Sequence, residues 1–340
     1  MLDVYVVHVY GDKMSHVDKI KRTMPDKIIL FANEEYDVHG IFKDFVDELY
    51  PWLIEHNKTV DILAPGFDRQ INDRVFVHKS YGYQLMNRIY TVDRYSHMNF
   101  DNVHEQADKL YTLYCNRGSF ERMKIIDTFA REKMIDQGIV TFKGVYYFEN
   151  FNELWEYHDG SPLIDEEGYN SINNSRIEYE PNSFPRSFFR GLVDVVCESR
   201  VDDLEFFATE KTAKSLIAQK PFLALSCQHY HRYLQEEYGI ELYTELFDYS
   251  FDSCKDVNDR IEGIVSNVKN IMNMDKNTLH SLVFDKLVHN KRVFENYIID
   301  YNKMVPSVLQ FVNEVPYTLH GDDYIMLQWL DYGKQHGYVK

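Results

Sequence analysis

The sequence predicts an α/β protein built from two Rossmann-like domains, with further helices toward its carboxyl end. Three observations lead to this prediction. Short, nearly continuous apolar runs recur between polar or turn-forming residues, as expected of parallel strands that are buried on both faces. Segments whose apolar residues recur at helical spacing separate these runs. The chain has 340 residues, which is more than one hydrophobic core usually supports.

Residues 1–105 are expected to form the first domain. Four strands rich in β-branched and aromatic residues are predicted here, at residues 4–9, 27–32, 59–63 and 74–78. Two helices are predicted between them, at residues 13–24 and 41–53. Pro51 lies inside the second helix and is expected to kink or divide it. The polar and acidic residues 101–109 are interpreted as a linker into the second domain.

Residues 106–300 are expected to form the second domain. Its predicted strands are residues 110–115, 138–143, 192–197 and 222–225. Its predicted helices include residues 120–134, 230–238 and 257–272. Residues 279–312 are expected to form one or two helices, interrupted before Pro306. Residues 144–189 show no sustained period and are interpreted as a long insertion, whose aromatic residues favour burial over disorder. Residues 301–340 are expected to form a helical segment that braces the two domains.

The composition limits the classes of function. A formal charge of −17 argues against indiscriminate nucleic-acid binding, because phosphate contacts need a positive surface. Residues 66–94 are an exception, with five Arg or Lys against three Asp and several interleaved Tyr and Phe. Such a segment could grip an anionic or stacked acceptor, nucleic acid included. The favoured interpretation is a loop and a strand with solvated charges.

The cysteines and the apolar segments indicate the compartment. No two of the four cysteines have metal-ligand spacing, so we expect reduced thiols, mostly buried, and no disulfide framework. No uninterrupted apolar run approaches the length of a membrane span, and the first ten residues lack a basic region. We therefore expect a cytoplasmic protein (in the host cytoplasm if it is viral) that does not cross a membrane.

Charged residues collect where the strands of the second domain end. Glu198 follows the strand at 192–197, and Thr209, Glu210 and Lys211 open the next helix. Arg117 lies in the short loop between the strand at 110–115 and the helix after it. The carboxyl ends of parallel strands meet at one edge, where ligands bind, and a helix N-terminus there favours phosphate. Arg117 is therefore expected to bind a phosphate or, alternatively, to pair with a structural carboxylate.

The same residues carry a family resemblance. Glu198 and Ser199 are followed by a polar turn, by the block Phe-Ala-Thr-Glu-Lys at 207–211, and by a helix that leads to Pro221 and an apolar strand. This order resembles the donor site of α1,3-fucosyltransferase-type glycosyltransferases. In that family Phe-Glu-Asn-Ser precedes Tyr-Val-Thr-Glu-Lys and an Ala-Leu-Leu-Ala-Gly-x-x-Pro run. The resemblance covers about one tenth of the chain, and Thr-Glu-Lys is its most specific part.

The resemblance implies a GT-B-like enzyme, in which two Rossmann-like domains face a cleft and a nucleoside diphosphate sugar is the donor. Arg117 and Lys211 would then contact the diphosphate, and Glu210 would accept hydrogen bonds from ribose or sugar hydroxyls. Glu198 either shares that role, helps to orient Lys211, or forms a structural ion pair. Thr209 is either a helix cap or a hydroxyl contact.

No motif for a competing chemistry is present. The sequence lacks a strand followed by Gly-x-Gly-x-x-Gly, a Gly-x4-Gly-Lys-Ser/Thr loop, a His-Glu-x-x-His pair and a Gly-x-Ser-x-Gly elbow. His229 and His231 are two positions apart and would point to different sides of a helix, so no zinc site is expected. We therefore expect a metal-independent site without a cofactor, in which cations and a helix N-terminus stabilise the leaving diphosphate.

The acceptor side is the first domain. If the transfer inverts the anomeric centre, a general base must come from this side, and Asp12 and His8 at the end of the first strand are the candidates. For His8, a satisfied core histidine is the favoured alternative. The resemblance implies a glycan hydroxyl as acceptor. The chain also resembles phage-encoded proteins in general style, which suggests a hydroxymethylated base of phage DNA. A non-catalytic nucleotide-sugar or glycan-binding protein and a viral scaffold protein stay open.

Overall fold

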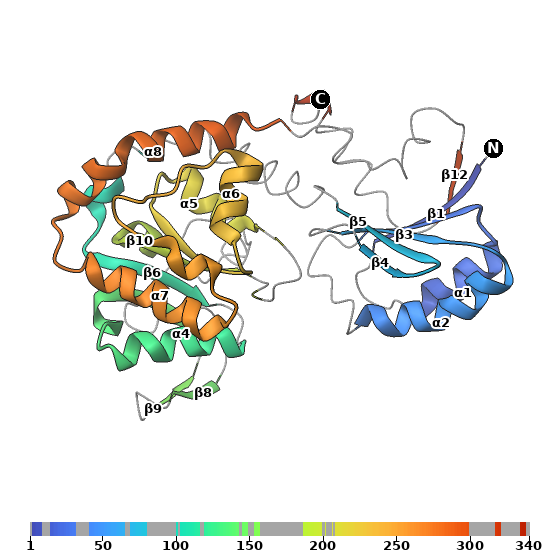
Figure 1. Ribbon diagram of the computed structural model, residues 1–340, viewed down its shortest axis with the longest axis horizontal. Coiled ribbons are helices and arrows are strands. Elements are labelled where there is room, and N and C mark those ends of the chain that lie inside the picture. Colours follow the sequence, from blue (N-terminus) through green and yellow to red (C-terminus); the bar gives the residue numbers. More distant parts are fainter. Residues whose placement is uncertain are drawn as a thin grey trace. The chain divides into compact units, whose positions relative to one another are not determined.

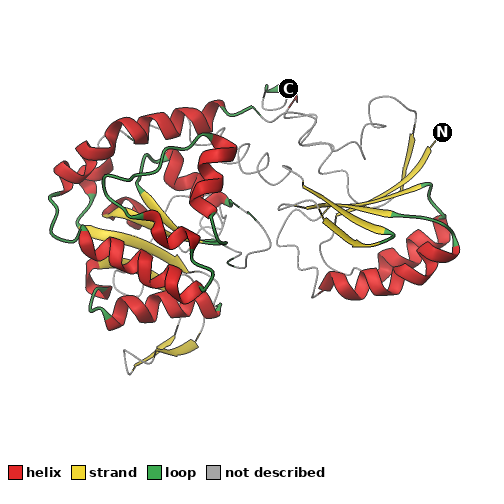
Figure 2. Cartoon of the chain, viewed as in Figure 1, coloured by secondary structure: helices red, strands yellow, loops and turns green. Residues whose placement is uncertain are grey.

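The computed structural model describes residues 2–8, 14–31, 41–64, 69–79, 100, 103–115, 119–142, 145–148, 153–156, 186–198, 201, 206, 208–298, 317–320 and 334–337. The chain divides into two compact units. Unit 1 comprises Met1–Ile89, Leu204–Phe206 and Ile298–Lys340, and unit 2 comprises Tyr90–Asp203 and Phe207–Tyr297. Both contain a sheet of mainly parallel strands with helices beside it, so the predicted α/β class is confirmed (Figure 2).

Unit 1 is organised around a six-stranded sheet of order β12-β1-β2-β3-β5-β4. Its strands are β1 (Leu2–His8), β2 (Lys27–Phe31), β3 (Val60–Ala64), β4 (Arg69–Asn72), β5 (Val75–Lys79) and β12 (Tyr317–His320). All neighbours are parallel except β4 and β5. The helices α1 (Met14–Thr23) and α2 (Ile41–Glu55) lie on the same side of this sheet (Figure 1).

Alternation along the strands explains how this sheet is covered. Ile28 and Leu30 of β2 join the apolar cluster that α1 and α2 contribute to. Ile29 lies between them and points to the opposite face, yet it is also fully buried. The sheet is therefore covered on both faces here, as the uninterrupted apolar run predicts. Pro51 lies within α2 and does not divide the helix.

Unit 2 contains a four-stranded, fully parallel sheet of order β11-β10-β6-β7. Its strands are β6 (Lys109–Cys115), β7 (Gly138–Phe142), β10 (Gly191–Cys197) and β11 (Phe222–Leu225). Its helices are α4 (Phe120–Arg131), α5 (Glu210–Ile217), α6 (Tyr230–Tyr238), α7 (Val257–Asn270) and α8 (Lys276–Asn296). Helices α4 and α7 pack together on one side of the sheet, and α5 packs with α8 on the other (Figure 1).

The described part of unit 2 also contains four 3-10 helices: η1 (Val103–Gln106), η2 (Ile135–Gln137), η4 (Arg186–Arg190) and η5 (Tyr249–Ser253). The region expected to be an irregular insertion contains an antiparallel hairpin of β8 (Val145–Phe148) and β9 (Glu153–Glu156). The structure also differs from the expected domain limits. The division falls after Ile89 and not after residue 105, and the segment expected to be helical, 301–340, supplies strand β12 to unit 1. A four-residue strand is too short to show a reliable period, and only pairing with β1 fixes it.

A histidine protects the free edge of β11. The amide of Ala224 donates to Nε2 of His231 at 3.0 Å, so the proton of the imidazole must lie on Nδ1, which donates to Asp252 at 2.8 Å. The carboxylate of Asp252 also accepts from the amides of His231 and Arg232 at the start of α6. His231 thus takes the place of a neighbouring strand and ties α6 to the sheet.

Lys220, two residues before β11, lies at the centre of a second buried polar cluster. Lys220 is 3% exposed, and its Nζ donates to the Thr112 hydroxyl at 2.8 Å and to the Phe188 carbonyl at 2.6 Å. The Thr112 hydroxyl donates in turn to Asp194 at 2.6 Å, and Ser215 donates to the second oxygen of the same carboxylate. Burial lowers the pKa of Lys220 to about 7, against the opposing effect of the Asp194 charge.

Candidate functional site

The predicted donor-site residues of β10 and α5 come together at the carboxyl edge of the unit 2 sheet. Glu198 follows the last residue of β10, and its amide donates to the carbonyl of Leu225, the last residue of β11. Thr209 is the N-cap of α5, and Glu210 and Lys211 are the first two residues of that helix. The βαβ connection from β10 through α5 to β11 therefore places one carboxylate, one hydroxyl and one Glu-Lys pair at the same edge.

Glu198 is a buried carboxylate that neutral donors hold in place. It is 1% exposed. Its Oε1 accepts from the Thr209 amide at 3.1 Å, from the Thr212 hydroxyl at 2.6 Å and from the Tyr230 hydroxyl at 3.0 Å. Its Oε2 accepts from the Thr209 hydroxyl at 2.5 Å. The ion pair that was one interpretation of Glu198 is not seen among the described residues, and Glu198 instead joins β10 to the first turns of α5 and α6.

Thr209 connects this carboxylate to the lysine. Its backbone is extended, with φ −99° and ψ −176°, as is usual for an N-cap residue. Its hydroxyl accepts from the Lys211 amide at 3.3 Å and from Lys211 Nζ at 3.1 Å, while it donates to Glu198. A hydrogen-bond relay therefore runs from the ammonium group of Lys211 through Thr209 to Glu198. Thr209 is thus a helix cap, and Glu198 positions Lys211 through it.

Glu210 and Lys211 form a charged pair at the start of α5. Lys211 Nζ lies 3.0 Å from Glu210 Oε1, and the side chains are 27% and 11% exposed. Burial raises the pKa of Glu210, but the charges of Lys211 and Lys214 outweigh it and lower the pKa to about 2. Glu210 is therefore ionised at neutral pH. Burial lowers the pKa of Lys214, one turn along the same helix, to about 8.

Arg122 is a cation at this edge to which the sequence assigned no separate role. It lies in the first turn of α4 and is 6% exposed. One terminal nitrogen of its guanidinium donates to the carbonyls of Cys197 and Glu198, at 3.3 Å each. The signal in the sequence is its spacing, because Arg122 stands four and seven residues before the buried Ile126 and Phe129 and hence on the buried face of the helix. A charged residue on such a face needs polar partners, which the end of β10 supplies.

Three predicted site residues are not placed at this edge. Arg117 and Asp12 lie outside the described residues. His8 is the last residue of β1 and belongs to unit 1.

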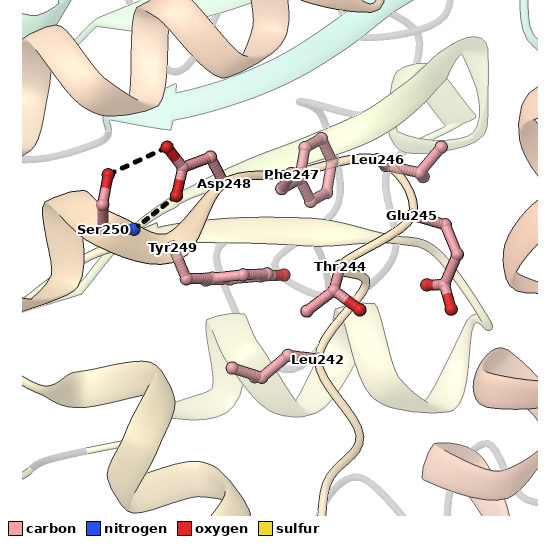
Figure 3. A pocket seen from close by; sticks show the side chains of 8 residues that line it. All are labelled: Leu242, Thr244, Glu245, Leu246, Phe247, Asp248, Tyr249 and Ser250. Carbon is pink, nitrogen blue, oxygen red and sulfur yellow. Dashed lines mark hydrogen bonds between the residues drawn. The ribbon is translucent and has the colours of Figure 1, made fainter.

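A separate hollow of about 580 Å³ lies along residues 242–250 of unit 2 (Figure 3). None of the edge residues lines it. Its polar groups bind one another or α8: Asp248 accepts from the amide and the hydroxyl of Ser250, and Lys286 donates to Glu245 at 2.8 Å. Lys286 also donates to the carbonyl of Leu242 at 2.7 Å. Thr244 and Glu245 thus hold this loop to α8 through Lys286, while Asp248 and Ser250 bind each other.

Comparison of the chain with family models, with curated proteins and with solved structures finds no match. Among the described residues, no helix is both long enough and apolar enough to cross a membrane. The described part of the chain also shows no group of three or more His, Cys, Asp or Glu side chains arranged to hold a metal ion.

Proposed function

We propose that this protein is a glycosyltransferase that transfers a sugar from a nucleoside diphosphate sugar to a hydroxyl group without a metal ion. The observation that carries the proposal is the relay at the carboxyl edge of unit 2. Buried Glu198 fixes Thr209, and Thr209 fixes the partly exposed ammonium group of Lys211. Such a preorganised cation at the N-terminus of α5 suits the charge that develops on a leaving diphosphate. The Thr-Glu-Lys block that builds it is also the most specific part of the fucosyltransferase resemblance.

Each residue has a chemical role in this proposal. Lys211 binds a diphosphate oxygen, and Arg117 and the guanidinium of Arg122 add positive charge nearby. Ionised Glu210 accepts hydrogen bonds from hydroxyl groups of the ribose or the sugar. In the transfer, the bond between the anomeric carbon and the diphosphate oxygen breaks with its electron pair on that oxygen. The acceptor oxygen forms the new bond to the anomeric carbon and gives its proton to a base.

The general base, the acceptor, the domain arrangement and the location are part of the same proposal. In an inverting transfer the base is Asp12 or His8. The acceptor is the hydroxyl of a glycan or of a hydroxymethylated base in phage DNA. The proposal also includes a fold of two Rossmann-like domains that face a cleft. It further includes a cytoplasmic location.

Binding of nucleoside diphosphates and hydrolysis of their sugars test this function. We expect the wild-type protein to bind at least one of UDP, GDP, ADP and dTDP in calorimetry, and to hydrolyse the matching sugar in the presence of EDTA. Lys211→Ala should weaken this binding about 10- to 100-fold, the equivalent of one charge-assisted hydrogen bond. Lys269→Ala is the matched control, because Lys269 is a half-exposed surface lysine of α7 that pairs with Glu132.

The outcomes separate the three classes of function. Turnover that disappears in Lys211→Ala, while the variant stays folded, supports the enzyme. Nucleotide binding without turnover of the sugar donor, whether or not an acceptor is supplied, favours a non-catalytic nucleotide-sugar-binding protein. If the wild-type protein shows neither binding nor turnover with any of the four nucleotides and their sugars, a scaffold role is favoured. If Lys211→Ala binds a nucleotide as well as Lys269→Ala does, the proposed site is wrong.

A further inference from the structure

Two histidines of unit 2 stack face to face, and neither belongs to the segments that form the proposed donor site. The ring centroids of His104 and His280 are 3.5 Å apart, and the ring planes meet at only 11°. His104 belongs to η1, which precedes the first strand of the sheet, and His280 belongs to α8, the last helix of the unit. The stack therefore joins the beginning of unit 2 to its end.

The surroundings of the stack favour neutral rings. Nδ1 of His104 is buried and has no hydrogen-bond partner. Phe284 lies against the far ring, with its centroid 5.5 Å from that of His280. A protonated imidazole is a donor at both nitrogens, and at His104 one of these donors would be buried without an acceptor. Protonation is therefore costly unless the two elements separate and water enters.

The neighbouring charges offset this cost only in part, so the pKa of His104 stays lowered. Lys276 lies one turn before His280, and its Nζ donates to the carbonyls of Glu105 and Ala107 at 2.8 and 3.2 Å. Its positive charge opposes protonation of His104, and the carboxylate of Glu105 favours it. From η4, which also contacts η1, the guanidinium of Arg190 is bound at 2.9 and 2.6 Å to both oxygens of Asp108 at the start of β6.

We propose that the stack of His104 on His280 is an acid-sensitive clasp, which holds η1 against α8 while both rings are neutral and opens on acidification. Burial lowers the pKa of both histidines. At His104 the carboxylate of Glu105 opposes this shift and Lys276 adds to it, and at His280 the charge of His104 adds to it. The unfolded or opened chain therefore takes up protons at a higher pH than the closed clasp does. The clasp is at full strength above the usual histidine pKa of about 6.5 and weakens as the pH falls below it.

Hydrogen exchange of the whole protein tests the clasp. Between pH 7.5 and pH 5.5, after correction for intrinsic exchange rates, we expect a rise of about tenfold or more in the exchange of peptides that cover η1 and the first turns of α8. His280→Phe keeps a flat ring in the stack but cannot be charged, so its rise should be reduced to less than about threefold. His289→Phe is the matched control, because His289 lies on the same helix and binds the Gly239 carbonyl outside the stack. It should behave like the wild type.

A titration of the wild-type protein supports or overturns the clasp even if a variant does not fold. Histidine ring signals in NMR of the wild-type protein should show that both rings titrate below about 6.5. A folded His104→Asn variant should in addition raise the titration midpoint of His280, because the charge of His104 is then absent. The proposal is wrong if either ring of the wild-type pair titrates at or above this value. It is equally wrong if His280→Phe shows the same acid-induced rise in exchange as the wild type.

Discussion

Glu198 offers the sharpest test of how the carboxyl edge of unit 2 is built. Glu198→Gln keeps the size of the side chain and replaces one carboxylate oxygen by an NH2 group. If the amide oxygen takes the place of Oε1, it still accepts from the Thr209 amide and from the hydroxyls of Thr212 and Tyr230. The NH2 group then faces the Thr209 hydroxyl, which already accepts from the amide and the Nζ of Lys211. The bond from Thr209 to Oε2 is therefore lost.

The expected magnitude follows from these bonds. A hydrogen bond to a charged group contributes about 1.5–3 kcal/mol and a neutral one about 1 kcal/mol, so the loss of one charged bond and the weakening of the others should cost about 3 kcal/mol. Removing the buried charge returns part of its desolvation cost, but the fixed donors left behind offset that return. For a domain of about 200 residues, this loss lowers Tm by about 6–12 °C.

Urea unfolding and thermal melting of the variant measure this loss. Glu245→Gln is the control, because Glu245 is an exposed carboxylate that pairs with Lys286 and should contribute less than about 1 kcal/mol. A change within about 0.5 kcal/mol of the wild type for Glu198→Gln would refute the argument that these bonds hold the edge together.

Two further predictions concern packing and pH. Gly263→Ala, inside α7, would gain about 1 kcal/mol from helix propensity, but its new Cβ would lie 2.3 Å from the Cβ of Phe251. We expect a net loss of about 1–3 kcal/mol in urea unfolding, and an equal or higher stability would contradict the packing argument. Lys220→Met should remove part of the pH dependence of the free energy of unfolding. Between pH 7 and pH 10.5 the unfolded wild-type chain keeps a proton on Lys220 that the folded chain has lost. The free energy of unfolding of the wild type therefore rises with pH relative to that of the variant. Unfolding curves at pH 6.5, 8 and 9.5 check the difference, and parallel pH profiles would count against it.

The sequence alone predicted where many single strands and helices begin and end. Strands β2, β6, β10 and β11 and helices α1 and α6 lie within one or two residues of their expected bounds. Their signals are local, because apolar runs and helical spacing act over a few residues. The sequence also placed Glu198, Thr209, Glu210 and Lys211 at one edge, since the carboxyl ends of parallel strands must meet there.

Only the tertiary structure decided which side chains meet across the chain. The amide, hydroxyl and ammonium partners of Glu198 and Thr209 come from α5 with its N-cap and from α6. The carbonyls that Arg122 binds are 75 and 76 positions away. Lys276 binds a carbonyl 171 positions away, beside the stacked histidines. Strand β12 likewise joins β1 from the opposite end of the chain. Local pattern carries no information about such contacts, because they form only when packing and loop closure bring distant segments together.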